Sequence, residues 1–315
     1  MINFWFVGTG DFAALLLPML VKSFNISKII THSPSIAKRG LNEEITPVER
    51  AAVKAGFKPL RTSLFTSDEA IKNEFQNNES KPDGIFVIDY GERIIEPFLT
   101  GTTFGCINIH PSLLPKYRGA APIQRALENG EQTIGVTLFQ LGKEMDAGPI
   151  ISQTAEEISI EDNFPEIMNK AALLGNQLAC EWLDKITTHR DKVIAHPQDH
   201  KAATYAPKIL KTESQQSFNI TAELLHNRVR AFNPNPGVWI PFLGKRLKLI
   251  VTYPLIEAPS SSGVGEIIMF DEGTPVVKCK EGAIMLKQVQ PEGKRIMDGK
   301  DWANGSRIKS GDVIE

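Results

Sequence analysis

The first 150 residues alternate short apolar runs with segments of helical periodicity. Apolar and aromatic residues fill Ile2 to Val7, and from Asp11 to Phe24 the apolar residues recur at helical spacing. This pattern predicts a strand, a glycine turn and a helix. Further strands and helices are expected over Ser27 to Thr31, Ile45 to Ala55, Gly84 to Ile88, Cys106 to His110, Pro122 to Glu128 and Gly135 to Leu141. Such alternation is typical of an α/β fold with a parallel sheet, whose ligands bind beyond the carboxyl ends of the strands.

Two helices carry recognisable start signals. We expect Thr46 to cap the helix that begins at Pro47, because a threonine oxygen accepts an unpaired amide and proline suits the first helical position. A long amphipathic helix is expected over Phe164 to Ile186, with Asp162 as its cap.

The pattern changes in the last third of the chain. A helix is expected over Ala222 to Ala231, followed by short strands between Gly, Pro, Asp and Ser residues, over Arg246 to Tyr253, Gly265 to Phe270, Pro275 to Lys280 and Ala283 to Val289. Short strands at this spacing favour a small β-barrel. We therefore expect an α/β domain over 1–189, a polar linker over 190–206 and a C-terminal barrel domain over 207–315.

Composition excludes several classes of protein. The 315 residues have a net charge of −2, with 42% hydrophobic and 23% charged residues, which is close to the average for globular proteins and unlike disordered, collagen-like or coiled-coil chains. The apolar stretch Leu15 to Val21 is far shorter than the ~20 residues of a membrane span, and Met1 to Gly10 lacks the charge of a secretory signal. Three widely spaced cysteines suggest neither a disulfide framework nor a metal site. We expect a cytoplasmic protein.

A glycine turn follows the first strand. The spacing Gly8-x-Gly10-x-x-Ala13 fits a loose dinucleotide fingerprint, in which a pyrophosphate binds at a helix N-terminus. The acidic residue expected roughly 20 positions later is missing, because the second strand ends in Thr31-His32-Ser33-Pro34. The sequence therefore favours a tight turn that lines a cleft over a nicotinamide site.

Polar side chains gather around the strand that ends at His110. Asn108 and His110 are two residues apart and share one face of that strand, and a stiff loop with two prolines follows. Asp146 follows the next strand, and its carboxylate could hold the tautomer of an imidazole. An amide, an imidazole and a carboxylate suit acyl transfer, in which one oxygen gains charge and a proton must leave the attacking group. From spacing alone, a structural role for His110 stays equally open.

Other polar residues give weaker indications of a functional site. The remaining histidines lack the spacing of zinc-binding motifs, so no metal site is expected. Lys38 and Arg39 lie in a loop after a strand and could contact phosphate, although Glu43 and Glu44 follow closely. A plain solvated loop is the alternative.

Two sets of motifs stand out in this chain. The first set is Asn108 with His110, Ser112-Leu113-Leu114-Pro115 followed by Arg118-Gly119, and Asp146. The second set is Ala120-Ala121-Pro122-Ile123-Gln124, Ala203-Thr204-Tyr205-Ala206-Pro207-Lys208-Ile209, Arg230-Ala231-Phe232-Asn233-Pro234 and Gln288-Val289-Gln290-Pro291-Glu292-Gly293. The first set is similar to that of folate-dependent formyltransferases in general. With the second set, the chain resembles over nearly its whole length the methionyl-tRNA formyltransferases, a branch of that family.

The resemblance implies a Rossmann-like formyltransferase domain and a C-terminal OB-like barrel that binds tRNA. The implied reaction transfers a formyl group from 10-formyltetrahydrofolate, as donor substrate, to the α-amine of initiator methionyl-tRNA, for translation initiation. A monomer without metal is expected. Asn108, His110 and Asp146 would be catalytic. The implied binding residues are Ser112, Leu113, Leu114, Pro115, Asp89 and Gly91 for folate, and Lys38 and Arg39 for tRNA.

A related chemistry remains an alternative. The segment His110 to Gly119 is also similar to formyltransferases that act on small amines, such as glycinamide ribonucleotide or an amino sugar nucleotide. The loop that contains Arg39 carries glutamates where the tRNA enzymes usually have lysines. The acceptor is therefore the part of the reaction that the sequence leaves open.

Overall fold

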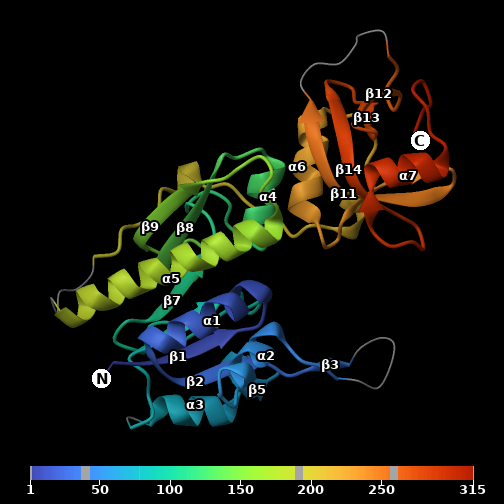
Figure 1. Cartoon of the computed structure of the whole chain (residues 1–315). Coiled ribbons are helices and arrows are strands. Elements are labelled where there is room, and N and C mark those ends of the chain that lie inside the picture. The colour runs from blue at the N-terminus through green and yellow to red at the C-terminus, as the bar shows by residue number, and fades with distance from the viewer. Residues whose placement is uncertain (1, 37–42, 78, 189–193, 256–261, 315) are drawn as a thin grey trace. The chain divides into compact units, whose positions relative to one another are not determined.

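A computed structural model describes residues 2–36, 43–77, 79–188, 194–255 and 262–314. The chain forms two compact units (Figure 1). Residues 1–119, 134–156 and 168–205 belong to the first unit, and residues 120–133, 157–167 and 206–315 belong to the second. Each unit therefore combines segments that are far apart in the sequence.

The first unit is built on a seven-stranded sheet in the order β5-β2-β1-β6-β7-β8-β9. Strands β5, β2, β1, β6 and β7 pair in parallel, whereas β8 is antiparallel to β7. The expected α/β sheet is thus confirmed. Its strands are β1 (Asn3–Gly8), β2 (Asn25–His32), β5 (Leu60–Thr62), β6 (Gly84–Ile88), β7 (Cys106–His110), β8 (Thr133–Gln140) and β9 (Ile150–Glu157).

Both faces of this sheet are covered. Successive strand residues point to opposite faces, and Phe4 and Trp5 of β1 are both buried. On one face Phe4 packs edge-on against Trp182, with ring centroids 5.8 Å apart, and on the other Trp5 packs against Phe75 at 6.0 Å. This two-sided burial explains why the strand is a continuous apolar run.

Helices supply those two layers. Trp182 comes from α5, which lies along one face in Figure 1, and Phe75 comes from α3. A Cβ atom at Gly175 of α5 would lie 2.5 Å from Ile109 of β7, so glycine permits the close approach of helix and sheet. The unit contains α1 (Asp11–Ser23), α2 (Pro47–Lys54), α3 (Glu69–Gln76), most of α5 (Phe164–Thr188), the short strands β3 (Ser35–Ile36) and β4 (Glu43–Glu44), and the 3-10 turns η1 (Phe65–Ser67) and η2 (His200–Ala202).

Of the two expected caps, one is confirmed and one is wrong. Thr46 accepts a hydrogen bond from the amide of Glu49 at 3.0 Å, as predicted for α2. At α5, Asn163 and not Asp162 is the cap, since Asn163 Oδ1 accepts the amide of Glu166 and Glu166 Oε2 accepts that of Asn163. This reciprocal pair satisfies two amides at once. Asp162 instead accepts the amide of Ser159.

The second unit contains an antiparallel sheet in the order β10-β11-β14-β13-β12, with β15 paired to β14. This arrangement is consistent with the expected barrel-like domain. Its elements are α4 (Pro122–Glu128), η3 (Lys211–Ser214), α6 (Ala222–Phe232), β10 (Val238–Phe242), β11 (Lys245–Leu255), β12 (Ile267–Asp271), β13 (Thr274–Lys278), β14 (Ala283–Pro291), β15 (Met297–Asp298) and α7 (Gly299–Ser306).

Helix α4 belongs to this second unit although it precedes β8 in the chain. Arg125 of α4 donates to both carboxylate oxygens of Glu213, at 2.8 and 3.0 Å. Glu128 accepts from Arg228 of α6 at 3.0 Å. The hydrogen bonds from Arg125 lower the pKa of the Glu213 carboxyl. The sequence predicted this helix but not its partners.

Candidate functional site

The predicted catalytic residues of β7 lie at the carboxyl edge of the parallel sheet. Strands β6 and β7 are paired neighbours, so their carboxyl ends meet at one edge. Ile109 faces α5, which leaves Asn108 and His110 together on the opposite face. His110 is buried and Asn108 is half-buried. Within the described part of the chain, the Asn108 amide makes no side-chain hydrogen bond, so it is available to a ligand.

The backbone of the following loop fixes the ring of His110. The His110 Nε2 atom lies 2.9 Å from the carbonyl oxygen of Tyr117. Because a carbonyl only accepts, Nε2 carries the proton and Nδ1 is the nitrogen left to exchange one. Nδ1 lies 3.9 Å from Oδ2 of Asp146, which is an ion-pair distance and too long for a direct hydrogen bond.

Asp146 is held by the same loop. Its Oδ2 atom accepts a hydrogen bond from the amide of Gly119 at 2.8 Å. Asp146 and Tyr117 both adopt left-handed backbone conformations, with φ of 51° and 60°. Such conformations are costly for residues other than glycine and concentrate at functional sites. The structure thus brings His110 and Asp146 together, and it adds contacts from Tyr117 and Gly119, for which the sequence predicted no role.

The predicted folate loop is shaped by two residues from neighbouring strands. Thr137 donates to the carbonyl of Ser112 at 2.6 Å and accepts the amide of Leu114 at 3.1 Å, while Gln153 donates to the carbonyl of Leu114 at 2.8 Å. Ser112 and Leu114 are buried, and the Ser112 hydroxyl donates to the carbonyl of Lys116. Leu113 is exposed and Pro115 half-buried, so these two are the members of the loop that present side chains to the surface.

Asp89 lies at the end of β6 and reaches back to the glycine turn. Its carboxylate accepts the amide of Phe12 at 3.3 Å, and its carbonyl accepts the amides of Thr9 and Gly10. A carboxylate therefore lies at the N-terminus of α1, where a dinucleotide fold would bind a phosphate. The glycine turn therefore matches the dinucleotide fingerprint in sequence, but the negative carboxylate of Asp89 occupies the place where a phosphate would bind. Gly91 is exposed just beyond.

The predicted tRNA-contacting residues Lys38 and Arg39 lie outside the described residues. Of their loop, the structure describes the flanking strands β3 and β4, which pair antiparallel, with Ser35 opposite Glu44 and Ile36 opposite Glu43.

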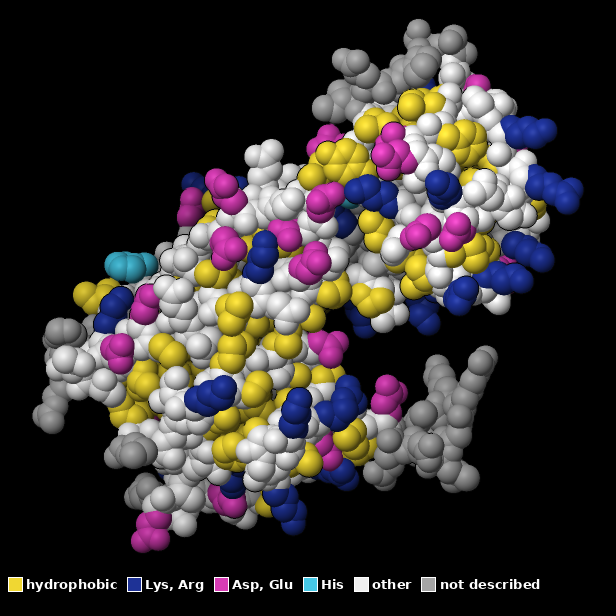
Figure 2. All heavy atoms as spheres, viewed as in Figure 1, with side chains coloured by type: hydrophobic (Ala, Val, Ile, Leu, Met, Phe, Trp, Pro, Cys, Tyr) yellow, Lys and Arg dark blue, Asp and Glu magenta, His cyan; other side chains and the backbone are white. Residues whose placement is uncertain are grey.

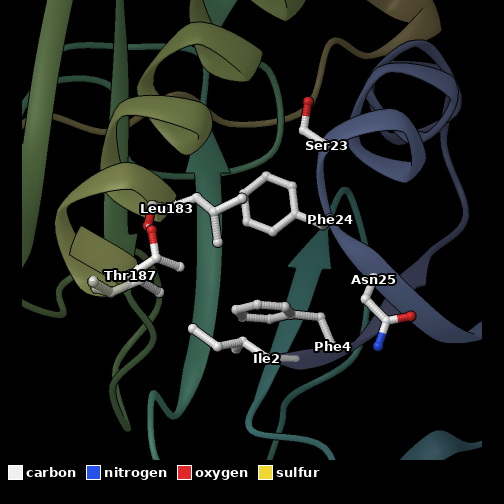
Figure 3. A pocket seen from close by; sticks show the side chains of 8 residues that line it. Ile2, Phe4, Ser23, Phe24, Asn25, Leu183 and Thr187 are labelled. Carbon is white, nitrogen blue, oxygen red and sulfur yellow. The ribbon is translucent and has the colours of Figure 1, made fainter. Parts of the chain in front are cut away.

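A hollow of about 510 Å³ lies elsewhere on the first unit, lined by apolar residues such as Phe4, Phe24 and Leu183 (Figure 3). Ile2 and Asn25 also line it, at the amino ends of β1 and β2. It is therefore at the edge of the sheet opposite to His110 and is not part of the candidate site.

Two features are absent from the residues that the structure describes. No group of three or more His, Cys, Asp or Glu side chains in those ranges could hold a metal ion. Within the same ranges, no helix has the length and apolar character needed to cross a membrane.

Comparison with known proteins gives matches over both units. Residues 2–183 match the family model described as formyl transferase, and residues 208–307 match that of the formyl transferase C-terminal domain. The chain is 38% identical to the methionyl-tRNA formyltransferase of Kosmotoga olearia, over 98% of this chain and 96% of the relative. It is 37% identical to that of Thermotoga maritima, over 97% and 96%.

Solved structures share the fold at lower identity. The N-formyltransferase from Helicobacter canadensis, in complex with folinic acid and dTDP-3-aminofucose, matches with a TM-score of 0.65 and 18% identity, over 92% of this chain and 100% of that one. HypX from Aquifex aeolicus in complex with tetrahydrofolic acid matches with a TM-score of 0.62 and 16% identity, over 98% and 48%. With family models and full-length relatives in agreement, the chain belongs to the formyl transferase family.

Proposed function

We propose that this protein transfers the formyl group of 10-formyltetrahydrofolate to the α-amine of methionine on initiator tRNA. The observation that carries the proposal is the placement of Asn108, His110 and Asp146 at the carboxyl edge of a formyl transferase sheet. The acceptor follows from relatives named methionyl-tRNA formyltransferase that match almost the whole chain. The protein would act in the cytoplasm, where translation begins, and as a monomer.

The chemistry requires two things of these residues. When the amine attacks the formyl carbon, the carbonyl oxygen becomes an oxyanion, and the unpaired amide of Asn108 donates to it. Nδ1 of His110 lies 3.9 Å from the carboxylate of Asp146, so the two side chains can reach the reacting groups together. The carbon–nitrogen bond to the acceptor forms in this attack, and the bond to the folate nitrogen breaks when the oxyanion collapses.

One proton must also move from the attacking amine to the departing folate nitrogen. Asp146 is the base in this proposal: its carboxylate, fixed by the amide of Gly119 beside His110, takes the proton from the amine and returns it to the folate nitrogen as that nitrogen leaves. The Tyr117 carbonyl accepts from Nε2 of His110 and restrains the ring, which keeps Nδ1 on the side of Asp146.

We propose that the folate donor lies along the ends of β6 and β7. Leu113 and Pro115 are the candidates for folate contact, because their side chains are accessible. Ser112 and Leu114 are buried and fix the loop through their hydrogen bonds. Gly91 flanks the same edge. Asp89 supports the turn before α1, so we propose that it acts on this region through its contact with Phe12.

The tRNA contacts are proposed for the second unit as well as for Lys38 and Arg39. Figure 2 shows Lys and Arg side chains gathered along one side of the second unit. Trp239 of β10 lies opposite Lys248 of β11. The guanidinium of Arg246, also on β11, lies 4.7 Å from the centre of the Trp239 ring. Basic and aromatic side chains on one sheet suit a phosphate backbone with accessible bases.

A direct assay tests the proposal. Purified protein is given 10-formyltetrahydrofolate with methionyl-initiator tRNA, glycinamide ribonucleotide or an amino sugar nucleotide, and formylated product is measured. The proposal expects methionyl-tRNA to be the preferred acceptor. Faster formylation of either small amine would show that this amine, and not methionyl-tRNA, is the acceptor, and the proposed formyl transfer would stand. An absence of transfer to all three would overturn the proposed reaction.

A further inference from the structure

Gln198 differs from its neighbours in the segment that the sequence assigns to a linker. Among residues 194 to 200 it is the buried one, with 6% of its surface exposed, and the others are exposed or half-buried. A buried polar side chain is tolerated only where its hydrogen bonds are made. Its contacts therefore show what the segment does.

Both ends of the Gln198 amide are fully used within the first unit. Its Oε1 accepts from Nε and Nη2 of Arg118, at 3.1 and 2.6 Å. Its Nε2 donates to the backbone carbonyls of Asp146, at 2.9 Å, and Gly148, at 2.7 Å. One side chain thus joins two loops that are otherwise separated in the sequence.

Those two loops hold the candidate catalytic pair. Arg118 lies between Tyr117, whose carbonyl accepts from His110, and Gly119, whose amide donates to Asp146. Asp146 has a left-handed backbone at the point where its carbonyl accepts from Gln198. The segment is also tied down on either side, since His196 pairs with Ile150 and Thr204 Oγ1 accepts the amide of Tyr117.

We propose that Gln198 is a positioning residue, which sets the separation of His110 and Asp146 by joining the Arg118 loop to the Asp146 loop. The inference rests on the proposed function for its catalytic meaning. The arrangement predicts that a change at Gln198 alters turnover more than substrate binding, because a displacement near 1 Å in reacting groups costs up to roughly 10²-fold.

Gln198→Glu is the decisive substitution. A glutamate retains an acceptor for Arg118 but offers no donor to the carbonyls of Asp146 and Gly148, so it cuts the link to one loop alone. Gln198→Met removes both links at similar volume and serves as the second variant if the first does not fold. Gln76→Glu, on the exposed end of α3, is the matched control.

We expect Gln198→Glu to lower the thermal unfolding temperature, because two carbonyls lose their donor, but to stay folded at the assay temperature with both KM values near wild type. Its kcat should fall roughly 10-fold to 10²-fold, with an altered pH dependence of kcat, whereas Gln76→Glu changes neither. Wild-type kcat and pH dependence in the folded variants would overturn the proposal. So would a loss of activity that is explained entirely by the unfolded fraction.

A second readout separates this inference from the proposed function. Nitrogen-15 shifts of the His110 imidazole report which ring nitrogen carries the proton, and they need no substrate. Loss of the single Nε2-protonated form in Gln198→Glu supports the positioning role even if methionyl-tRNA is not the acceptor. An unchanged His110 spectrum, with wild-type formylation of methionyl-tRNA, would reject the role of Gln198 and leave the proposed function intact.

Discussion

A Cβ atom at Gly10 would lie 1.9 Å from Oδ2 of Asp89, so the carboxylate fills the space that a side chain would take at the turn. That carboxylate accepts the amide of Phe12, one of the unpaired amides at the start of α1. Gly10, at the N-cap position, has no side chain to do so. Asp89, directly after β6, therefore provides the cap that the helix itself lacks.

This pair predicts non-additive stability. Gly10→Ala should displace the carboxylate and remove the cap, costing about 0.5–2 kcal/mol, and Asp89→Ala should cost a similar amount. Both changes remove the same interaction, so their costs should not add. The double variant should be at most about 0.5 kcal/mol less stable than the less stable of the two single variants. Urea unfolding of the four proteins measures this. Fully additive losses would contradict the shared cap.

Asn108→Ala should lower kcat by about 10² to 10³-fold, the effect of removing one oxyanion donor. Folate affinity should change little, because the interaction is made mainly in the transition state. Steady-state kinetics with folate titration measure both quantities. Asn163→Ala, which removes a helix cap away from β7, controls for stability. A rise in KM without a fall in kcat would assign Asn108 to binding instead.

Asp146→Asn should reduce kcat by roughly 10²-fold or more while preserving the fold. Asparagine can still accept the amide of Gly119 through its oxygen, but it carries no charge beside His110 and cannot take the amine proton. The same outcome is expected for His110→Ala. The double variant should be little slower than either single one, since the two residues act as a unit. Near wild-type turnover in Asp146→Asn would remove it from the mechanism.

Arg246→Ala and Lys248→Ala should each weaken tRNA binding and reduce the slope of log K against log salt by just under one. Both side chains are exposed on β11 near Trp239. Arg39→Ala should act in the same way if its loop contacts phosphate. Filter binding between ~50 and 200 mM salt gives the slopes. Lys22→Ala, on an exposed turn of α1, should leave them unchanged. Equal slopes in all variants would exclude these contacts.

Stability should fall in mild acid because of His226. This buried ring donates to the carbonyl of Ile160 and accepts from the hydroxyl of Thr252, and burial lowers its pKa below the ordinary value near 6.5. The unfolded chain therefore binds a proton more readily. The contribution is fully present above about pH 6.5 and is lost as the pH falls through the lower folded pKa.

The measurement compares free energies of unfolding at pH 7.5 and pH 5.5. His226→Gln should be less stable at the higher pH but should lose less on acidification than the wild type. His200→Gln, an exposed position, should follow the wild type at both values. A wild-type protein and a His226→Gln variant with the same pH dependence would show that the ring does not titrate with unfolding.

The sequence was most informative where the signal is local. Thr46 and Pro47 are adjacent, and Asn108 and His110 share a strand, so short-range rules place them correctly. The sequence predicts the cap of α5 one residue too early, because Asp and Asn, at 162 and 163, have nearly equal preference for the cap position. Gln198 could not be found in this way, since it contacts Arg118 and Asp146, which are 80 and 52 positions away.

The place of helix α4 in the second unit limits which parts of the gene can be exchanged between relatives. The chain passes between its units at 119–120, 133–134, 156–157, 167–168 and 205–206, so neither unit is one uninterrupted stretch of a gene. A chimaera of two relatives joined at residue 206 would take α4 from one parent and α6 from the other. Its success would depend on whether the partners of Arg125 and Glu128 were compatible. Recombination is therefore expected to exchange residues 206–315 most readily between parents that preserve this ion-pair network.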